Sequence, residues 1–288
     1  MQHYKLVIAV RCHLWPQLVL DTIRSVFHYS RTYPLVVLAC DNNPRIGPIV
    51  QAKYPQVPYF VSQGKWGWGS GLYGLLSDTI NWLDNMSNIK YDHFLSIDYD
   101  TIAIGKDFDG ILLRELAKHP DVGLAGSHVP RSANWQHRFS KSREAILKCF
   151  NGQAATWPPP NYTPGESCLG GFMWLTPQCR ESMKAKGFFQ NPFRDIRGKI
   201  DLADDPWTAL LVRAAGYGIL DIKKMDHYGH IAWQSPGNWR MYPEQRMRIF
   251  NLGAISRGHD KTQELLTRNF FRKLRREKFL LQIRDGDP

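Results

Sequence analysis

The first hundred residues alternate between short apolar runs and amphipathic stretches, and this alternation constrains the fold more than any other feature of the sequence. The runs at 6–10, 35–40 and 94–97 are typical of buried strands, and the stretches at 17–28 and 72–85 are typical of helices. Strands that alternate with helices indicate right-handed βαβ units around a mostly parallel sheet. We therefore expect an α/β fold, in which ligands bind outside the carboxyl ends of the strands.

Acidic residues follow two of these runs. Asp41 ends the second run, and Asp98 and Asp100 follow the third. Because side chains alternate along a strand, we expect Asp98 and Asp100 to point to the same side. Two carboxylates on one side repel each other unless a cation or a donor-rich ligand lies between them, and Mg²⁺ and Mn²⁺ favour carboxylate together with substrate oxygens. The pattern predicts a divalent-metal site, with a turn that carries two solvated aspartates as the alternative.

The composition bounds the class of protein and its partners. A hydrophobic content of 43% and a charged content of 22% are typical of a globular chain. The net charge of +11 favours a polyanionic partner, which is nucleic acid, an acidic membrane surface or a phosphorylated substrate. Five cysteines without a C-x-x-C pair favour a reducing compartment over a disulfide framework or a zinc site.

No signal peptide is recognisable, and no apolar run reaches the roughly 18–20 residues that cross a bilayer. We expect a cytoplasmic protein. Attachment to a membrane surface, or residence in a host cytoplasm if the chain is viral, are the alternatives.

Three later segments carry candidate functional residues. The glycine-rich segment 64–71 precedes a predicted helix, so its Lys65 is either a phosphate contact or a solvated loop lysine. The stretch 130–164 has a looser pattern and predicts a long loop or an insert, and long loops in compact domains often cover a substrate site. Asp205 and Pro206 suit the N-cap and first turn of a helix that ends near 215.

The order of these segments resembles the GT-A fold of nucleotide-sugar glycosyltransferases over roughly residues 5–235, most closely family 2 and the polypeptide N-acetylgalactosaminyltransferase-like enzymes. Asp98-Tyr99-Asp100 is similar to the D-x-D motif. The resemblance implies that Asp100 binds Mn²⁺ or Mg²⁺ on the donor diphosphate and that Asp98 contacts the ribose, the sugar or the metal. It also implies that Asp41 accepts a hydrogen bond from the donor base, although Asp-Asn-Asn also suits a turn.

Further residues match motifs of the same families. Asp205 lies 11 residues before Gly216, a spacing similar to that of inverting family 2 enzymes, which implies that Asp205 is the general base. Asp204 stands where these enzymes usually have Glu, so its role is open. His230, in His-Tyr-Gly-His-Ile, resembles the histidine that completes the metal site. Lys65 falls in the segment beside the nucleotide, and the segment that contains Gly171 and Trp174 resembles the one under the donor sugar.

The resemblance implies a metal-dependent, inverting glycosyltransferase with a UDP-sugar as the expected donor. The excess of positive charge favours a hydroxymethylated base in viral DNA as the acceptor, with a lipid-linked or lipopolysaccharide molecule at a membrane surface as the alternative. A nucleotidyltransferase would share the acidic site but would need a glycine- and arginine-rich first loop, whereas residues 10–13 supply one arginine and no glycine. A non-catalytic nucleotide-sugar or nucleic-acid binding module is the remaining alternative.

We divide the chain into a nucleotide-sugar-binding half (1–125), an acceptor-binding and catalytic half of the same domain (126–250) and a basic helical tail (251–288). A helix drawn over 265–284 separates apolar from basic residues. Its apolar side is expected to face the domain and its arginines the solvent, an anionic membrane or a phosphate backbone. The apolar residues are Leu266, Phe270, Leu274 and Leu281, and the basic ones are Arg268, Arg272, Arg275 and Arg276.

Overall fold

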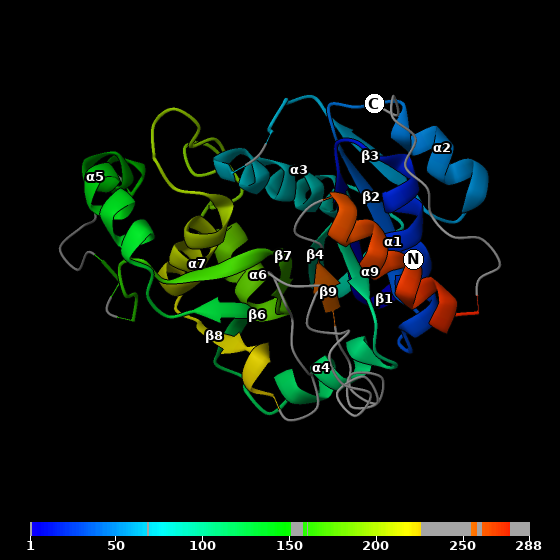
Figure 1. Ribbon diagram of the computed structural model, residues 1–288. Helices are drawn as coiled ribbons and strands as arrows, with labels where there is room; N and C mark the ends of the chain where they lie inside the picture. Colours follow the sequence, from blue (N-terminus) through cyan, green and yellow to red (C-terminus); the bar gives the residue numbers. More distant parts are fainter. Residues whose placement is uncertain are drawn as a thin grey trace.

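A computed structural model describes residues 2–67, 69–150, 158–159, 161–225, 255–257 and 261–276. A seven-stranded sheet runs through the molecule in the order β3-β2-β1-β4-β7-β6-β8 (Figure 1). Its strands are β1 (Gln2–Cys12), β2 (Leu35–Asp41), β3 (Tyr59–Ser62), β4 (Ile89–Asp98), β6 (Val122–Val129), β7 (Ser167–Leu175) and β8 (Gly218–Asp221). The α-helices are α1 (Pro16–Tyr29), α2 (Ile46–Lys53), α3 (Leu72–Asp84), α4 (Phe108–Leu116), α5 (Ala133–Cys149), α6 (Pro177–Ala185), α7 (Asp204–Ala214) and α9 (Lys261–Leu274).

The strand pairing confirms the expected α/β fold with a mixed, mostly parallel sheet. β1 lies in the parallel half, between β2 and β4, and β3 extends that half beyond β2. β7 is antiparallel to both of its neighbours, β4 and β6, and β8 is parallel to β6. The parallel arrangement brings the carboxyl ends of β1, β2 and β4 to one edge of the sheet.

Alternating side chains of the strands build a hydrophobic core on each face of the sheet. In β1, Val7 and Ala9 belong to the core that α3, α6 and α7 cover. Leu6, Ile8 and Val10 belong to the opposite core, which α1, α2 and α4 cover. Because both faces are covered, β1 reads as a continuous apolar run instead of an alternating one.

Helix α5 occupies part of the stretch that was expected to be a long loop or an insert, so the loop alternative is wrong for residues 133–149. Ser132 caps the helix, and its side chain accepts from the backbone N–H of Trp135 at 3.5 Å. The buried side chains of α5 lie three or four residues apart and therefore share one side: Phe139, Ser142, Ile146 and Cys149. The helix escapes sequence analysis because few of its residues are apolar.

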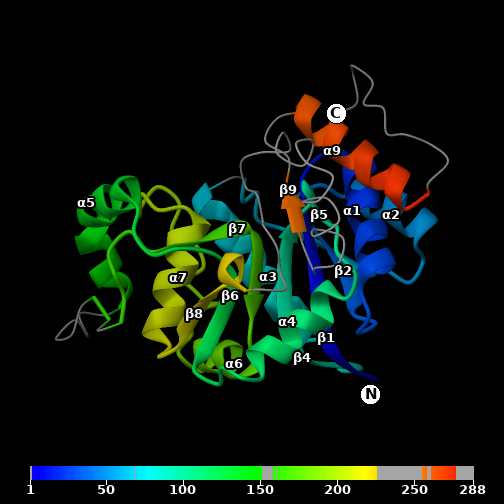
Figure 2. The ribbon, with the colours of Figure 1, turned by 60° about the horizontal axis from the view of Figure 1, so that its bottom comes forward.

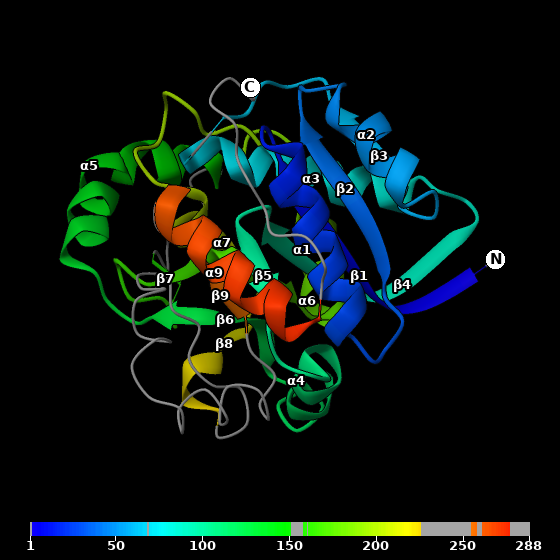
Figure 3. The ribbon, with the colours of Figure 1, turned by 45° about the vertical axis from the view of Figure 1, so that its right-hand side comes forward.

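The described part of the tail packs on the N-terminal half of the chain. Strand β9 (Ile255–Arg257) pairs antiparallel with β5 (Thr101–Ala103), and α9 lies beside α1 (Figures 2 and 3). Phe271 is buried in a small cluster with Ile102 and Ile104.

The side of α9 that faces the protein is partly the basic one, contrary to expectation. Arg268, Arg272 and Arg275 are buried and all donate to the carboxylate of Asp21 in α1, at 2.9, 3.1 and 2.6 Å respectively. Leu274, expected against the domain, is 44% exposed. Arg276 is exposed as expected, and Leu281 lies outside the described residues. A buried carboxylate attracts cations strongly enough to reverse the face that apolar periodicity predicts.

Across the described residues, no helix has the length and apolar character that crossing a membrane would require.

Candidate active site

Three polar residues end neighbouring strands at one edge of the sheet. Asp41 ends β2 and Asp98 ends β4, while Arg11 is the second-last residue of β1. Arg11 and Asp98 are register partners in the β1–β4 pair. All three side chains are nearly inaccessible, so their charges must be satisfied within the protein.

The guanidinium of Arg11 joins four elements. Its Nε donates to Asp98 at the end of β4 at 2.9 Å, and its Nη1 donates to Asp204 at the start of α7 at 2.9 Å. Its Nη2 donates to the carbonyl oxygen of Gly170 in β7. Burial acts to lower the pKa of Arg11, but the carboxylates of Asp98, Asp204 and Asp205 outweigh it and raise that pKa above its ordinary value. Arg11 therefore stays charged.

The two carboxylates at the start of α7 lie in different environments. The helix begins at Asp204 with Ala203 as its N-cap, so Asp205 is a first-turn residue and not the expected N-cap. Asp204 is 3% exposed and paired with Arg11, whereas Asp205 is half-buried. Both carboxylates lie at a helix N-terminus, where the helix dipole favours negative charge.

Gly170 allows β7 to lie directly against these carboxylates. A Cβ atom at this position would lie 2.5 Å from Oδ1 of Asp205 and 2.8 Å from Oδ2 of Asp204. The neighbouring Gly171 lies in β7 as well, and its carbonyl oxygen accepts from Oγ1 of Thr101 at 2.9 Å. The close approach thus occurs at Gly170, one residue from the position that the sequence singled out.

Trp174, expected to stack on a donor sugar, is fully buried in the core of the sheet. Its Nε1–H donates to Nδ1 of His93 in β4 at 3.1 Å. The structure therefore places Trp174 among the packing residues, out of reach of a ligand. An apolar strand residue next to two glycines looks the same in the sequence whether it faces a ligand or the core.

The carboxylate of Asp41 organises the glycine-rich segment 64–71. Its two oxygens accept from the backbone N–H groups of Trp66 at 2.7 Å and Gly67 at 2.8 Å. The Trp66 ring is buried, and a Cβ at Gly64 would lie 2.6 Å from it. Lys65 is exposed, and its carbonyl oxygen accepts from Arg197. At least one glycine of the segment thus makes room for the tryptophan of the segment itself.

Asp98, Tyr99 and Asp100 form what we call the acidic turn, between β4 and β5. Because β4 ends at Asp98, strand alternation does not extend to Asp100, which lies half-buried in the turn. The carbonyl oxygen of Tyr99 accepts from Oγ1 of Thr22 at 2.6 Å and from Nη2 of Arg268 at 2.6 Å. Side chains of helices α1 and α9 therefore hold the acidic turn in place through its backbone.

The chemistry of the acidic turn fits a hard divalent cation, since carboxylate oxygens are the ligands that Mg²⁺ and Mn²⁺ prefer. The described residues contain no group of three or more His, Cys, Asp and Glu side chains arranged to hold a metal. His230, the expected third ligand, lies outside the described residues.

Two pockets open near these residues. One is a narrow pocket of about 20 Å³ at the sheet edge, lined by Arg11, Cys12, His13, Asp41, Gly67, Leu72, Leu75, Asp98 and Tyr99. The other has a volume of about 680 Å³ and is lined mainly by α5 and by residues 198–203, which lead into α7. The start of α7, with Asp204 and Asp205, thus follows directly from the wall of the larger pocket.

Sequence analysis missed two buried arginines of the site. Arg11 was considered only as evidence against a nucleotidyltransferase, although a cation inside an apolar strand is a signal for a buried carboxylate partner. Arg268 was expected to face the solvent, an anionic membrane or a phosphate backbone, and nothing local to its helix indicates its contact with Tyr99.

No protein-family model matches the sequence, and neither does any curated protein. Several solved structures do match. Mouse xyloside xylosyltransferase 1 is 12% identical, with a TM-score of 0.49 over 91% of this chain and 99% of that chain. A mannosyltransferase from Pyrobaculum calidifontis in complex with GDP-Man and Mn²⁺ is 16% identical, with a TM-score of 0.45 over 76% of this chain and 55% of that chain. Glucosyl-3-phosphoglycerate synthase from Mycobacterium tuberculosis is 11% identical, with a TM-score of 0.38 over 67% of this chain and 66% of that chain. All three TM-scores lie below 0.5.

Proposed function

We propose that the protein is a metal-dependent glycosyltransferase that moves a sugar from a nucleotide-diphosphate sugar to an acceptor hydroxyl. The observation that carries this proposal is the junction at Arg11. There the acidic turn, the end of β1, Gly170 of β7 and the first turn of α7 meet around one buried guanidinium. Carboxylates suited to a cation thus lie near the start of α7, where Asp205 is suited to proton transfer.

In this proposal the acidic turn holds the metal. Asp100, with Asp98 beside it, would bind Mn²⁺ or Mg²⁺, which neutralises charge on the diphosphate leaving group. His230 stays a proposed ligand. Arg11 keeps the carboxylate of Asp98 at the strand end. The donor is proposed to be a UDP-sugar, with Lys65 and Gly171 beside it, and Asp41 shapes the loop next to it by binding the N–H groups of Trp66 and Gly67.

Asp205 is proposed to be the general base of an inverting reaction. Its neighbour Asp204 is committed to Arg11 and nearly inaccessible, so it is poorly placed to reach an acceptor hydroxyl. Asp205 is partly exposed, and in this role it takes the hydroxyl proton as that oxygen attacks the anomeric carbon. Asp204 would then be a positioning residue that ties α7 to Arg11.

The acceptor is proposed to be a polyanion, because the chain has a net charge of +11. A hydroxymethylated base in viral DNA is favoured over a lipid-linked or lipopolysaccharide acceptor. Arg268, Arg272 and Arg275, the tail arginines expected to meet a membrane or a phosphate backbone, face inward. The preference for DNA therefore rests on the positive charge outside the tail.

The Asp205→Asn variant tests this assignment. It should lose at least a hundredfold in transfer rate while it binds UDP and Mn²⁺ as the wild type does, because only the proton acceptor is removed. Transfer is measured as release of nucleotide diphosphate with a panel of nucleotide sugars and both acceptor types, with and without EDTA. The control is Asp92→Asn, a carboxylate near the opposite end of β4 that pairs with His3 and should keep full activity. Full activity of Asp205→Asn, or activity that survives EDTA, would contradict the proposal.

A further inference from the structure

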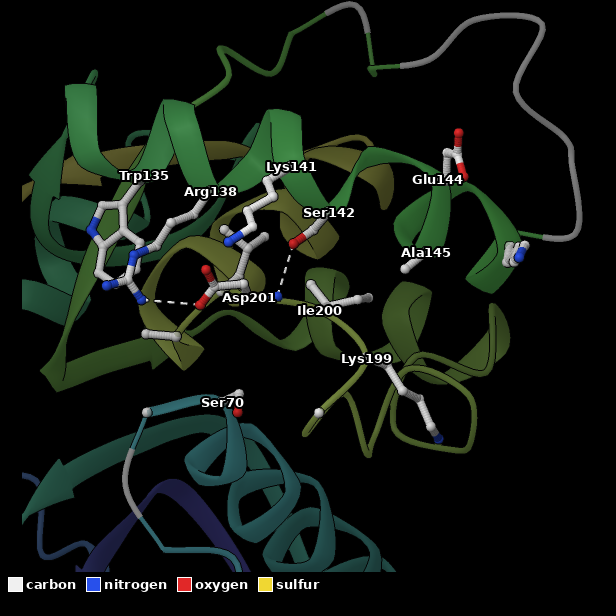
Figure 4. Close-up of a pocket in the computed structure, with 15 residues that line it drawn as sticks. Ser70, Trp135, Arg138, Lys141, Ser142, Glu144, Ala145, Lys199, Ile200 and Asp201 are labelled. Carbon is white, nitrogen blue, oxygen red and sulfur yellow. Dashed lines mark hydrogen bonds and ion pairs between the residues drawn. The ribbon is translucent and has the colours of Figure 1, made fainter.

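A pocket of about 680 Å³ separates α5 from the loop that precedes α7 (Figure 4). Gly69 and Ser70 of the glycine-rich segment complete its lining. Its volume falls in the range of about 300–1,000 Å³ in which small-molecule sites lie. The pocket therefore has the size of a binding site, and it lies between the glycine-rich segment and the start of α7.

One side of α5 gives the pocket its positive charge. Arg138, Lys141, Ala145 and Lys148 line the pocket, and their spacing of three or four residues puts them on the same side of the helix. Figure 4 shows Lys141 pointing from α5 toward Asp201 across the pocket, whereas Glu144 points away.

The negative charges near the pocket do not balance this side. Asp201 is engaged with Nη1 of Arg138 at 3.1 Å. Lys199 lines the opposite wall, but Figure 4 shows its side chain pointing away from α5, and its Nζ donates to the carbonyl oxygen of Asp195 at 3.5 Å. The lining residues thus comprise four cations and the carboxylates of Glu144 and Asp201. The excess favours an anionic ligand.

Trp135 adds an aromatic surface to the same pocket. Its ring is half-buried, and the guanidinium of Arg138 lies 5.2 Å from the ring centroid. An aromatic ring next to cations can stack on a base or pack on a sugar while the cations bind the neighbouring phosphate.

The walls of the pocket are fixed to each other and to the proposed base. The backbone N–H of Asp201 donates to Oγ of Ser142 in α5 at 2.8 Å, which ties the loop to the helix. Ala203 lines the pocket and is also the N-cap residue directly before Asp204 and Asp205. A ligand in this pocket thus lies next to the start of α7.

We propose that this pocket is the acceptor site and that it binds a phosphate group carried by the acceptor. That the ligand is an acceptor rests on the proposed function. That the pocket binds phosphate is argued from the residues of the pocket alone. Lys141 and Lys148 supply the compact charges that bind phosphate, and Trp135 packs on the sugar or base beside it. The phosphate belongs to a nucleic acid strand, a sugar phosphate or a lipid headgroup.

The test is a binding measurement on the double variant Lys141→Ala/Lys148→Ala. Both lysines are exposed, so their loss should leave the fold intact. Calorimetry at 50 mM salt would compare three probes, namely a twelve-nucleotide single-stranded DNA, glucose 6-phosphate and vesicles with anionic phospholipid, with glucose as the neutral control. We expect at least a tenfold loss of affinity for one of the three anionic probes, and the probe that loses affinity identifies the source of the phosphate. Raising the salt to 200 mM should reduce the loss.

The matched control is Lys118→Ala/Lys186→Ala, which removes the same charge from two exposed lysines outside the pocket. An equal loss in this control, or no loss in the pocket variant, would overturn the proposal. Binding of UDP and Mn²⁺ should be unchanged in both. These measurements need no turnover, so the two proposals can fail separately. If the protein transfers no sugar but only the pocket variant loses phosphate binding, the proposed glycosyltransferase activity is refuted and the proposed phosphate site is supported.

Discussion

Arg11 lies in the buried part of β1, and the N–H donors of its guanidinium reach β4, β7 and α7 at once. The guanidinium geometry suits this task because its N–H groups diverge in one plane, whereas the ammonium of a lysine has a single centre. Without it, the carboxylates of Asp98 and Asp204 would be buried close together with like charges. Arg11 thus allows the carboxyl ends of the strands and the start of α7 to lie together at one edge of the sheet.

Replacing Arg11 should be strongly destabilising. Arg11→Ala leaves two buried carboxylates without their cation and should lower the free energy of unfolding by about 3–5 kcal/mol. Arg11→Lys keeps the charge but not the fork, and it should cost about 1–3 kcal/mol. Urea unfolding measures both, with the exposed Arg143→Ala in α5 as a control that should change stability by less than about 0.5 kcal/mol. A midpoint for Arg11→Ala close to that of the wild type would refute this role.

Single residues were predictable where the strand itself determines their place. Asp41 and Asp98 were expected at strand ends and lie there, because apolar runs that end in Asp mark the edge of a buried sheet. The partners of these residues were not predictable. Arg11 contacts Asp98 because the two are register partners in the β1–β4 pair, and it contacts Asp204 although 193 positions separate them in the chain. The residues next to Arg11 in the sequence indicate neither contact.

At the scale of elements, α9 is a support for the acidic turn. Arg268 donates to Oδ2 of Asp21 at 2.9 Å and to the carbonyl oxygen of Tyr99 at 2.6 Å, so one side chain connects α9, α1 and the turn. Thr22 reaches the same carbonyl oxygen and also that of Thr101 at 2.8 Å. The turn that would hold the metal is thus braced by hydrogen bonds from two helices.

Removing this brace should loosen α9 and the acidic turn together. Arg268→Ala deletes the buried guanidinium, and we expect at least tenfold faster limited proteolysis within α9 and several-fold weaker Mn²⁺ binding. Lys273→Ala, an exposed position on the same helix, is the matched control and should change neither. If α9 becomes susceptible while Mn²⁺ affinity is unchanged, the helix does not support the turn.

Elements were predictable where apolar periodicity is strong and unpredictable where charge decides. The strands β1, β2 and β4 and the helices α1 and α3 follow the expected runs, whereas α2 and β3 were not predicted. α5 has few apolar residues, so the sequence suggested a loop. α9 has a clear apolar stripe, yet its arginines face inward because they bind Asp21 of α1. The sequence of α9 does not reveal the position of that carboxylate, so this orientation was not predictable.

At the scale of the whole molecule, β7 joins the parallel half of the sheet to the second half through its antiparallel pairs with β4 and β6. Trp174 of β7 and His93 of β4 lie at this seam, with Nδ1 of His93 accepting from the indole N–H. Burial lowers the pKa of His93 to about 4 from an ordinary value of 6.5. The neutral ring is therefore part of the folded state at neutral pH.

This histidine predicts acid sensitivity of the whole fold. The unfolded chain binds a proton at His93 below about pH 6.5 and the folded chain only near pH 4, so the stabilisation is complete above pH 6.5 and is lost as the pH falls to about 4. The loss should be on the order of 1–3 kcal/mol. Thermal unfolding from pH 7.5 to 4 measures it, and His93→Asn, whose amide oxygen can still accept from Trp174, should have a flatter profile. Parallel profiles for the two proteins would exclude His93 as the cause.

The contact between Arg268 and Tyr99 spans 169 positions of the chain, and this distance has a consequence for synthesis. Translation proceeds from the N-terminus at about 5–20 residues per second, so β1, β2 and β4 leave the ribosome long before α9 exists. The nascent sheet can pair its central strands early, but the acidic turn receives its last hydrogen bond only when residue 268 has emerged. The turn proposed to hold the metal is therefore fully braced only well after the strands on either side of it have been made.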